Sequence, residues 1–150
     1  MVDNFEFSST FLLFSDIERL KFQILKSEMD KYKIHPGQIP ILFIVKKNPG
    51  ISQKDLAEKV MLSTSTVAIM LRRMEKSGFV KKIQDENDRR FYHVYLTEKA
   101  LKIVEKIFKK LKEFERQSFE NFTNEEMELL ERLLKKILLN LEAMKDEKHF

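Results

Sequence analysis

Hydrophobic residues recur at helical spacing over most of the chain and at strand spacing in one short stretch. Between Ser9 and Tyr32 they form one stripe at alternating steps of four and three residues, which predicts an amphipathic helix. The stripe consists of Leu13, Ile17, Leu20 and Ile24, and Phe11 and Phe14 widen it on the same side. Pro36 and Gly37 then end the helix, because a proline disfavours helical backbone at the residue before it.

The next part of the chain predicts two short helices joined by a tight turn. Residues 39–45 are nearly all apolar, and their pattern suits a buried helix and a strand equally well. Ser52 caps a first short helix, with Asp55 at the capping-box position. The inward residues of this helix are Leu56, Ala57 and Val60. The capping residues 63–66 open a second helix, which ends at Gly78. Its buried stripe is Val67, Leu71 and Met74.

After this helix the hydrophobic residues recur at every second position, the spacing of a β-strand. Residues 79–84 and 91–96 alternate as strands do, and the polar residues 85–90 separate them. We expect a β-hairpin with a charged tip, and we call residues 85–90 the wing.

Two further helices are predicted after the hairpin. Thr97 caps a long amphipathic helix that runs to about Phe122, and Thr123 with Glu126 forms a capping box for the last helix. The last helix has a heptad seam, made of Met127, Leu130, Leu134, Ile137, Leu141 and Met144. Such a seam packs either inside one chain or against a partner. We favour a partner, because the first and last helices both lie outside the central unit.

The order of helix, turn, helix and hairpin predicts a winged helix-turn-helix. With Val67 facing inward, Ser65, Ile69, Arg72 and Lys76 fall on the opposite side of their helix, with Arg73 beside them. Such a polar surface fits the major groove of DNA, although an ordinary solvated helix has the same appearance. In the wing, Asp88 lies two residues before Arg90 and can orient its guanidinium toward the minor groove.

Charge distribution supports a polyanion partner for the middle of the chain. The net charge of the whole chain is +4, while residues 37–96 hold 11 Lys and Arg against six Asp and Glu.

The chain has no cysteine, which excludes disulfides, thiolate zinc sites and thiol sensors. The three histidines, His35, His93 and His149, have no catalytic or metal-ligand spacing, and the three glycines form no phosphate-binding loop. We therefore expect no enzyme activity and no cofactor.

Several ordered motifs resemble the MarR family of transcriptional regulators. The segment 51–60 is similar to the family's first motif helix, and residues 65–80 are similar to its recognition helix and exit. Asp88-Arg89-Arg90 resembles the family's Asp-x-Arg wing, and Leu96-Thr97 the start of its next helix. The chain departs from the family at Lys82, where an arginine is common, and at Ala100, where glycine is frequent.

The expected fold class is therefore mainly α with a small β hairpin (α+β), a winged helix-turn-helix flanked by dimerisation helices. The expected domains are residues 1–36 and 97–150 for dimerisation and residues 37–96 for DNA binding. Helix 63–77 is expected in the major groove and wing 85–90 in the minor groove. The candidate DNA-binding residues are Ser63, Thr64, Ser65, Thr66, Arg72, Arg73, Lys76, Asp88, Arg89 and Arg90.

The resemblance implies a homodimer that binds a palindromic operator in double-stranded DNA and acts as a repressor that a small-molecule effector releases. It also implies an effector site near Phe14 and Ile17, although these side chains also suit a core. A ligand-independent or architectural DNA-binding protein and a helical protein-interaction module are the alternatives. The acidic N-terminal residues do not resemble a signal peptide, and no apolar run is long enough to span a membrane, so we expect a soluble cytoplasmic protein.

Overall fold

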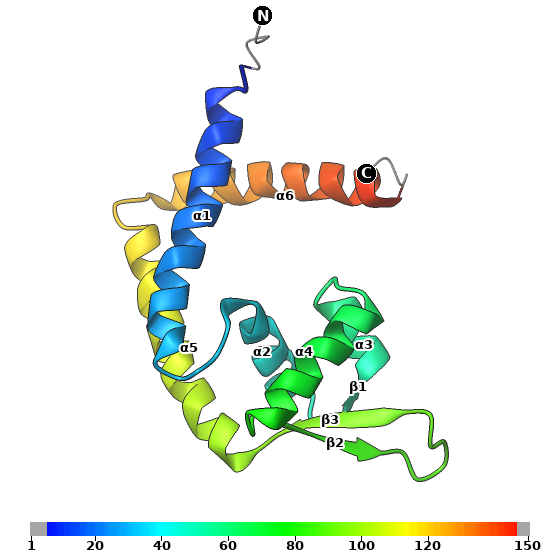
Figure 1. Ribbon diagram of the computed structural model, residues 1–150. Coiled ribbons are helices and arrows are strands. Elements are labelled where there is room, and N and C mark those ends of the chain that lie inside the picture. The colour runs from blue at the N-terminus through cyan, green and yellow to red at the C-terminus, as the bar shows by residue number, and fades with distance from the viewer. Residues whose placement is uncertain (1–5, 147–150) are drawn as a thin grey trace, which may run out of the picture. The chain divides into compact units, whose positions relative to one another are not determined.

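Helices make up most of the computed structural model, which describes residues 6–146 (Figure 1). The chain divides into two compact units, Met1–Lys109 and Lys110–Phe150. In order, the elements are α1 (Ser9–Asp30), the 3-10 turn η1 (Pro36–Gln38), α2 (Ile39–Lys47), β1 (Ile51–Ser52), α3 (Gln53–Lys59), α4 (Thr64–Lys76), β2 (Val80–Gln84), β3 (Tyr92–Leu96), α5 (Glu98–Ser118) and α6 (Asn124–Asp146). Within residues 6–146, no helix is long and apolar enough to cross a membrane.

The ambiguous apolar stretch 39–45 is a helix in the structure. It belongs to α2, with Pro40 in the first turn, where the missing N–H costs no hydrogen bond. Ile41, Leu42 and Val45 are fully or almost fully buried, because other elements pack around α2 on several sides. This burial explains why the segment lacks the one-sided pattern of a surface helix.

The sheet has three antiparallel strands in the order β1-β3-β2. The two long strands form the predicted hairpin, with Lys82 opposite Val94 and Ile83 opposite His93. The third strand, β1, was not predicted from the sequence, whereas the predicted N-cap Ser52 of the following helix is confirmed. Ile51 pairs with Val94, and α3 begins only at Gln53. A strand of two residues is too short to show a period, so the sequence could not reveal it.

The core of the first unit lies between the sheet and the helices around it. The predicted inward stripe of α4 (Val67, Leu71, Met74) is buried, as are Leu56 and Ala57 of α3. Val60, predicted to face inward, is only half-buried. The first half of α5 contributes Ala100, Val104 and Ile107 to the buried set. This packing leaves one side of α4 and the whole wing accessible.

The second unit contains the last part of α5 and all of α6. Thr123 and Glu126 form the predicted capping box: the Thr123 amide donates to Glu126 Oε2 at 2.8 Å, and the Glu126 amide donates to Thr123 Oγ1 at 3.1 Å. Helix α5 ends at Ser118, four residues before the predicted end near Phe122. None of the residues of α6, which the structure describes in full, is buried.

Candidate DNA-binding surface

The start of α4 is a cluster of hydroxyl groups held by its N-cap. Ser63 Oγ accepts the Thr66 amide at 3.1 Å, and it also lies 2.8 Å from Thr66 Oγ1 and 3.1 Å from Ser65 Oγ. Ser63, Thr64, Ser65 and Thr66 are all exposed. The cluster therefore combines small side chains, which permit close approach, with the positive end of a helix dipole.

The exposed side of α4 carries its cations. Arg72, Arg73 and Lys76 are exposed, and so is Ile69, while the opposite side of the helix is buried. This arrangement matches the orientation that the sequence predicts. Ser77 and Gly78 end the helix: the Ser77 hydroxyl donates to the Arg73 carbonyl at 2.9 Å, and Gly78 has a φ of 77°.

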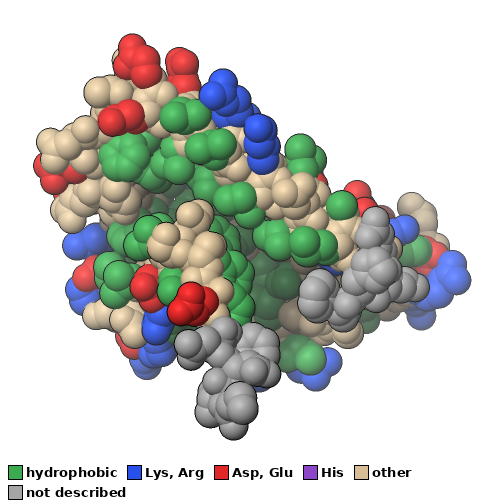
Figure 2. Space-filling model, turned by 90° about the horizontal axis from the view of Figure 1, so that it is seen from above, with side chains coloured by type: hydrophobic (Ala, Val, Ile, Leu, Met, Phe, Trp, Pro, Cys, Tyr) green, Lys and Arg blue, Asp and Glu red, His purple; other side chains and the backbone are tan. Residues whose placement is uncertain are grey.

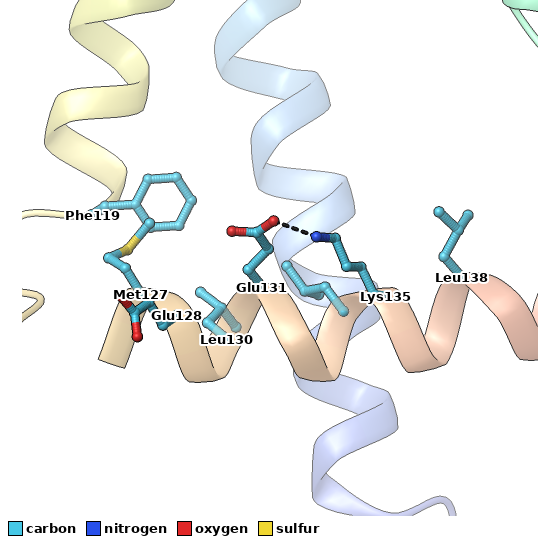
Figure 3. Close-up of a pocket in the computed structure, with 8 residues that line it drawn as sticks. Phe119, Met127, Glu128, Leu130, Glu131, Lys135 and Leu138 are labelled. Carbon is cyan, nitrogen blue, oxygen red and sulfur yellow. Dashed lines mark hydrogen bonds and ion pairs between the residues drawn. The ribbon is translucent and has the colours of Figure 1, made fainter. Parts of the chain in front are cut away.

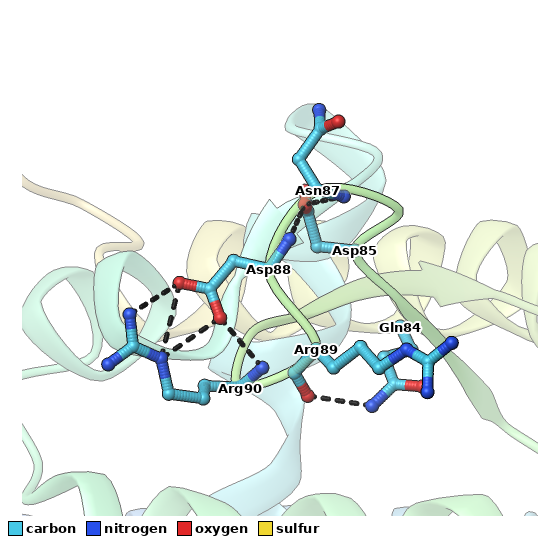
Figure 4. A network of polar contacts seen from close by, with 6 residues as sticks. All are labelled: Gln84, Asp85, Asn87, Asp88, Arg89 and Arg90. Atoms are coloured by element: carbon cyan, nitrogen blue, oxygen red, sulfur yellow. Dashed lines mark hydrogen bonds and ion pairs between the residues drawn. The ribbon is translucent and has the colours of Figure 1, made fainter.

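Polar side chains in the wing and at the end of β2 order the wing (Figure 4). Asp85 Oδ1 accepts the amides of Asn87 and Asp88, each at 2.8 Å. Gln84 Nε2 donates to the Arg89 carbonyl at 2.6 Å. These bonds shape a tight turn without any glycine, as Asx turns do.

Asp88 holds Arg90 in a forked ion pair. Asp88 Oδ1 accepts both the amide and Nε of Arg90 at 3.0 Å, and Oδ2 accepts its terminal nitrogen at 2.7 Å (Figure 4). This pairing lowers the pKa of Asp88 and raises that of Arg90. The Arg90 side chain is nevertheless 85% exposed. The guanidinium is thus oriented while it remains available to a ligand.

A shallow pocket connects α3, α4 and the base of the wing. Thr64, Arg72 and Arg90 line it, and the other seven predicted residues lie elsewhere on α4, at its cap or on the wing. The pocket also has lining residues outside the ten predicted ones, namely Gln53, Lys54, Ala68, Lys82, Phe91 and Tyr92. Lys82 Nζ lies 5.6 Å from the centroid of the Tyr92 ring.

Lys54 and Lys82 are the additional cations of this pocket. Lys82 is the position at which the sequence departs from the family pattern, so the sequence marked it as relevant to the wing base. Lys54 carries no such signal, because only the fold brings the first turn of α3 next to the wing. Four cations around one pocket suit a polyanion such as a nucleic-acid backbone.

Across residues 6–146, no group of three or more His, Cys, Asp or Glu side chains could hold a metal ion. His35 caps η1 by accepting the Gly37 amide at 3.0 Å, and His93 lies in β3. His149 lies outside the described residues. Phe14 and Ile17, candidates for an effector site or core, are exposed within the single chain.

Comparison with known proteins assigns this surface to a family. The model of the MarR family matches residues 34–91, which include α2 to the wing. The HTH-type transcriptional regulator BilQ of Clostridium symbiosum is 30% identical over 135 residues, which cover 89% of this chain and 94% of BilQ. A regulator of Bacillus subtilis, YybA, is 29% identical over 126 residues, 84% of each chain.

Solved structures show the same fold. A MarR protein from Peptoclostridium difficile superposes with a TM-score of 0.84 at 27% identity, over 95% of this chain and 94% of that one. MepR of S. aureus, solved in a complex with DNA, gives a TM-score of 0.83 at 25% identity, over 91% and 99%. The expected α+β winged-helix fold class is confirmed, and the relatives are transcription regulators rather than enzymes. This chain therefore belongs to the MarR family of winged helix-turn-helix transcriptional regulators.

Proposed function

We propose that the protein binds a palindromic operator in double-stranded DNA as a homodimer and represses transcription until a small effector releases it. Helix α4 with its cap, residues 63–77, enters the major groove, and wing 85–90 enters the minor groove. The observation that carries this proposal is the Asp88–Arg90 pair, which presents an oriented and exposed guanidinium next to the basic side of α4. A narrow minor groove attracts such a group through its negative potential.

The ten candidate residues divide into two roles in this proposal. Ser63, Thr64, Ser65 and Thr66 approach phosphates and base edges at the start of α4, and Arg72, Arg73 and Lys76 extend the contact along the helix. Asp88 orients Arg90, and Arg89 adds charge at the tip of the wing. The pocket cations Lys54 and Lys82 join them as phosphate contacts, because they flank Arg72 and Arg90.

The apolar surface of the outer helices supports a homodimer. Helix α1 exposes Phe11, Leu12, Leu13, Phe14, Ile17 and Leu20, and α6 exposes Leu134, Ile137, Leu138, Leu141 and Met144. Figure 2 shows such hydrophobic side chains at the surface as seen from above. A stable monomer rarely exposes this much apolar area. We propose that residues 1–36 and 97–150 form the dimer interface and hold two reading helices about 34–36 Å apart, one DNA turn.

A groove along α6 fits the same role. Its apolar lining residues are Phe119, Met127, Leu130, Leu134 and Leu138, and the ion pair of Glu131 with Lys135 is also part of the lining (Figure 3). A predominantly apolar groove with one ion pair in its lining suits a partner helix better than a polar metabolite.

DNA selection from a random duplex library tests the proposal. We expect recovery of a palindrome, and binding measured by fluorescence anisotropy should weaken steeply as salt rises, because bound Lys and Arg release counterions. A screen of small aromatic acids for loss of this binding tests effector release. Enrichment of no sequence, with weak binding to every duplex, would favour the architectural alternative. Binding to an acidic protein but to no duplex would favour the interaction module.

Expression of a fluorescent fusion tests the cellular side of the proposal, for which we propose the cytoplasm, where operator DNA is accessible. A reporter gene placed behind the selected palindrome should fall in expression when the protein is present. A rise in reporter expression would identify an activator and contradict the repressor assignment.

A further inference from the structure

His93 lies in β3 between two hydrogen-bond acceptors. Its Nδ1 is 2.9 Å from the Gly50 carbonyl oxygen, and its Nε2 is 2.7 Å from Asp85 Oδ2. A carbonyl oxygen and an ionised carboxylate only accept, so both bonds form only when both ring nitrogens carry protons. The geometry therefore describes an imidazolium.

Asp85 connects this ring to the turn of the wing. Its Oδ2 faces His93, while its Oδ1 accepts the amides of Asn87 and Asp88. Asp88 in turn holds Arg90 through its own carboxylate. One continuous series of polar contacts thus leads from the sheet to the guanidinium that we propose to enter the minor groove.

The other end of the series lies in a well-fixed part of the domain. Gly50 has a φ of 82°, and its amide donates to the Val94 carbonyl at 2.9 Å, which binds it to β3. A side chain at this position would approach Tyr95 Oη to 2.8 Å, so the backbone lies directly against β3. The Gly50 carbonyl is therefore a fixed acceptor for His93.

We infer that His93 is a positioning residue for Arg90, and that its protonation decides whether the wing is anchored for DNA binding. The inference rests on the proposed DNA-binding function. When the ring loses a proton, one nitrogen becomes an acceptor, and either Asp85 or Gly50 loses its partner. Either loss breaks the series of contacts that joins the Gly50 carbonyl to the turn carrying Asp88 and Arg90, while the bond from Gln84 to the Arg89 carbonyl remains.

The charges around His93 agree with this assignment. The hydrogen bond to Asp85 has the largest effect on the pKa of His93, and the bond to the Gly50 carbonyl has the next largest. Both raise this pKa above its ordinary value of 6.5, and desolvation lowers it by a smaller amount. The same pair lowers the pKa of Asp85 to about 2. The other titratable or charged side chains of the wing, of β3 and of the elements that contact it are Glu86, Asp88, Arg89, Arg90, Tyr92, Tyr95, Lys81, Lys82, Lys46, Lys47, Lys54, Asp55, Glu58 and Lys59. Asp85 supplies the charge that raises the pKa of His93.

The direction of the pH dependence follows. Because the folded pKa of His93 is raised, the anchor is fully present below pH 6.5 and is lost as the pH rises through the raised pKa. At acid pH it persists until Asp85 is protonated, at about 2. DNA binding should therefore weaken on the alkaline side.

A titration by NMR of the full chain tests the anchor without DNA. We expect the two ring nitrogens of His93 to show imidazolium shifts at pH 6.5, and the amides of Asn87, Asp88 and Arg90 to titrate with the same midpoint. Asp85→Asn should lower that midpoint and uncouple the amides. The inference would be overturned by a His93 ring that is neutral at pH 6.5, or by wing amides whose chemical shifts do not change with the titration of His93.

Binding to the selected duplex, measured from pH 6 to 9 at constant ionic strength, tests the consequence. Wild-type affinity should fall roughly three- to tenfold across the His93 midpoint. His93→Gln should bind weakly with a flat profile, and the matched control His35→Gln should follow wild type. A His93→Gln profile like that of wild type overturns the inference. Absence of wild-type binding at every pH overturns the proposed function, and the NMR titration still decides whether His93 anchors the wing.

Discussion

The hydroxyl of Thr97 donates a hydrogen bond to the carbonyl oxygen of Gly78 at 2.6 Å and so joins the start of α5 to the end of α4. Thr97 Oγ1 also accepts the amide of Ala100 at 3.1 Å, which makes Thr97 the cap of α5. Lys99 adds a second link, since its Nζ donates to the Ser77 carbonyl at 3.0 Å. The exit of the proposed reading helix is therefore fixed to the next helix.

Thr97→Val should destabilise the fold, because valine keeps the shape of threonine and loses both hydrogen bonds. We expect the free energy of unfolding to fall by about 1–2 kcal/mol, measured by urea denaturation. Thr97→Ser keeps the hydroxyl and should stay within about 0.5 kcal/mol of wild type. Equal losses in the two variants would mean that the methyl group contributes as much as the hydroxyl, and an unchanged Thr97→Val would contradict this account.

The sequence predicted those elements whose hydrophobic period is one-sided. The stripes of α1 and α4, the hairpin and the cap at Thr123 follow directly from spacing and capping chemistry. Helix α2 remained ambiguous because it is buried on several sides, and β1 went unnoticed because Ile51 and Ser52 are too few to show alternation. In both cases tertiary packing, rather than local preference, determines the conformation.

The candidate surface was likewise only partly predictable. Arg72 and Arg90 could be identified because one is opposite a buried stripe and the other is two residues from an acid. Lys54 could not, because its place beside the wing arises from the packing of α3. The role of His93 depends on Gly50, which is 43 residues away in the sequence and adjacent only in the folded sheet.

Arg90→Ala should weaken binding to the selected duplex about ten- to a hundredfold, because it removes the guanidinium from the wing. Asp88→Asn should cause a smaller loss, since Arg90 keeps its charge but loses its oriented partner. In the double variant, Asp88→Asn should add almost nothing to the loss from Arg90→Ala. Fluorescence anisotropy gives all four affinities, and additive losses would show that Asp88 does not act through Arg90.

Arg72→Ala and Lys54→Ala should affect DNA binding in different ways, the first through sequence preference and the second through overall affinity. Arg72 lies on the exposed side of α4, so its loss should relax sequence preference at one operator position by about 1–3 kcal/mol. Lys54 belongs to α3 and should contact only backbone phosphate, so its loss should weaken all duplexes alike and reduce the salt slope by about 1. Competition against single-base operator variants distinguishes the two. If Arg72→Ala lowered the affinity for every duplex equally, Arg72 would contact only backbone phosphate and no base.

Gly50→Ala and Gly78→Ala separate backbone strain from steric conflict. Both glycines have positive φ, 82° and 77°, so alanine at either position costs about 1 kcal/mol of stability. At Gly50 the new methyl group would also meet Tyr95 Oη at 2.8 Å, whereas at Gly78 its nearest neighbour is 3.9 Å away. Thermal unfolding should therefore show the larger loss for Gly50→Ala, and Tyr95→Phe should partly restore it. A larger loss at Gly78 would contradict this account.

Leu134→Glu should dissociate the proposed homodimer. Leu134 belongs to the apolar seam of α6 and is 44% exposed within the single chain, so a charge there leaves the subunit fold intact and disrupts only a partner's contact. Ala143→Glu is the matched control. It adds the same charge nine residues later, about 180° around the helix from Leu134.

Sedimentation equilibrium should give a dimer for wild type and Ala143→Glu and a monomer for Leu134→Glu. The same variant should lose high affinity for the full palindrome while its weak affinity for a single half-site remains, because the reading surface of each subunit is unchanged. A Leu134→Glu protein that stays dimeric would exclude the α6 seam from the interface. A wild-type protein that is monomeric yet binds the palindrome tightly would remove the need for two subunits held one DNA turn apart.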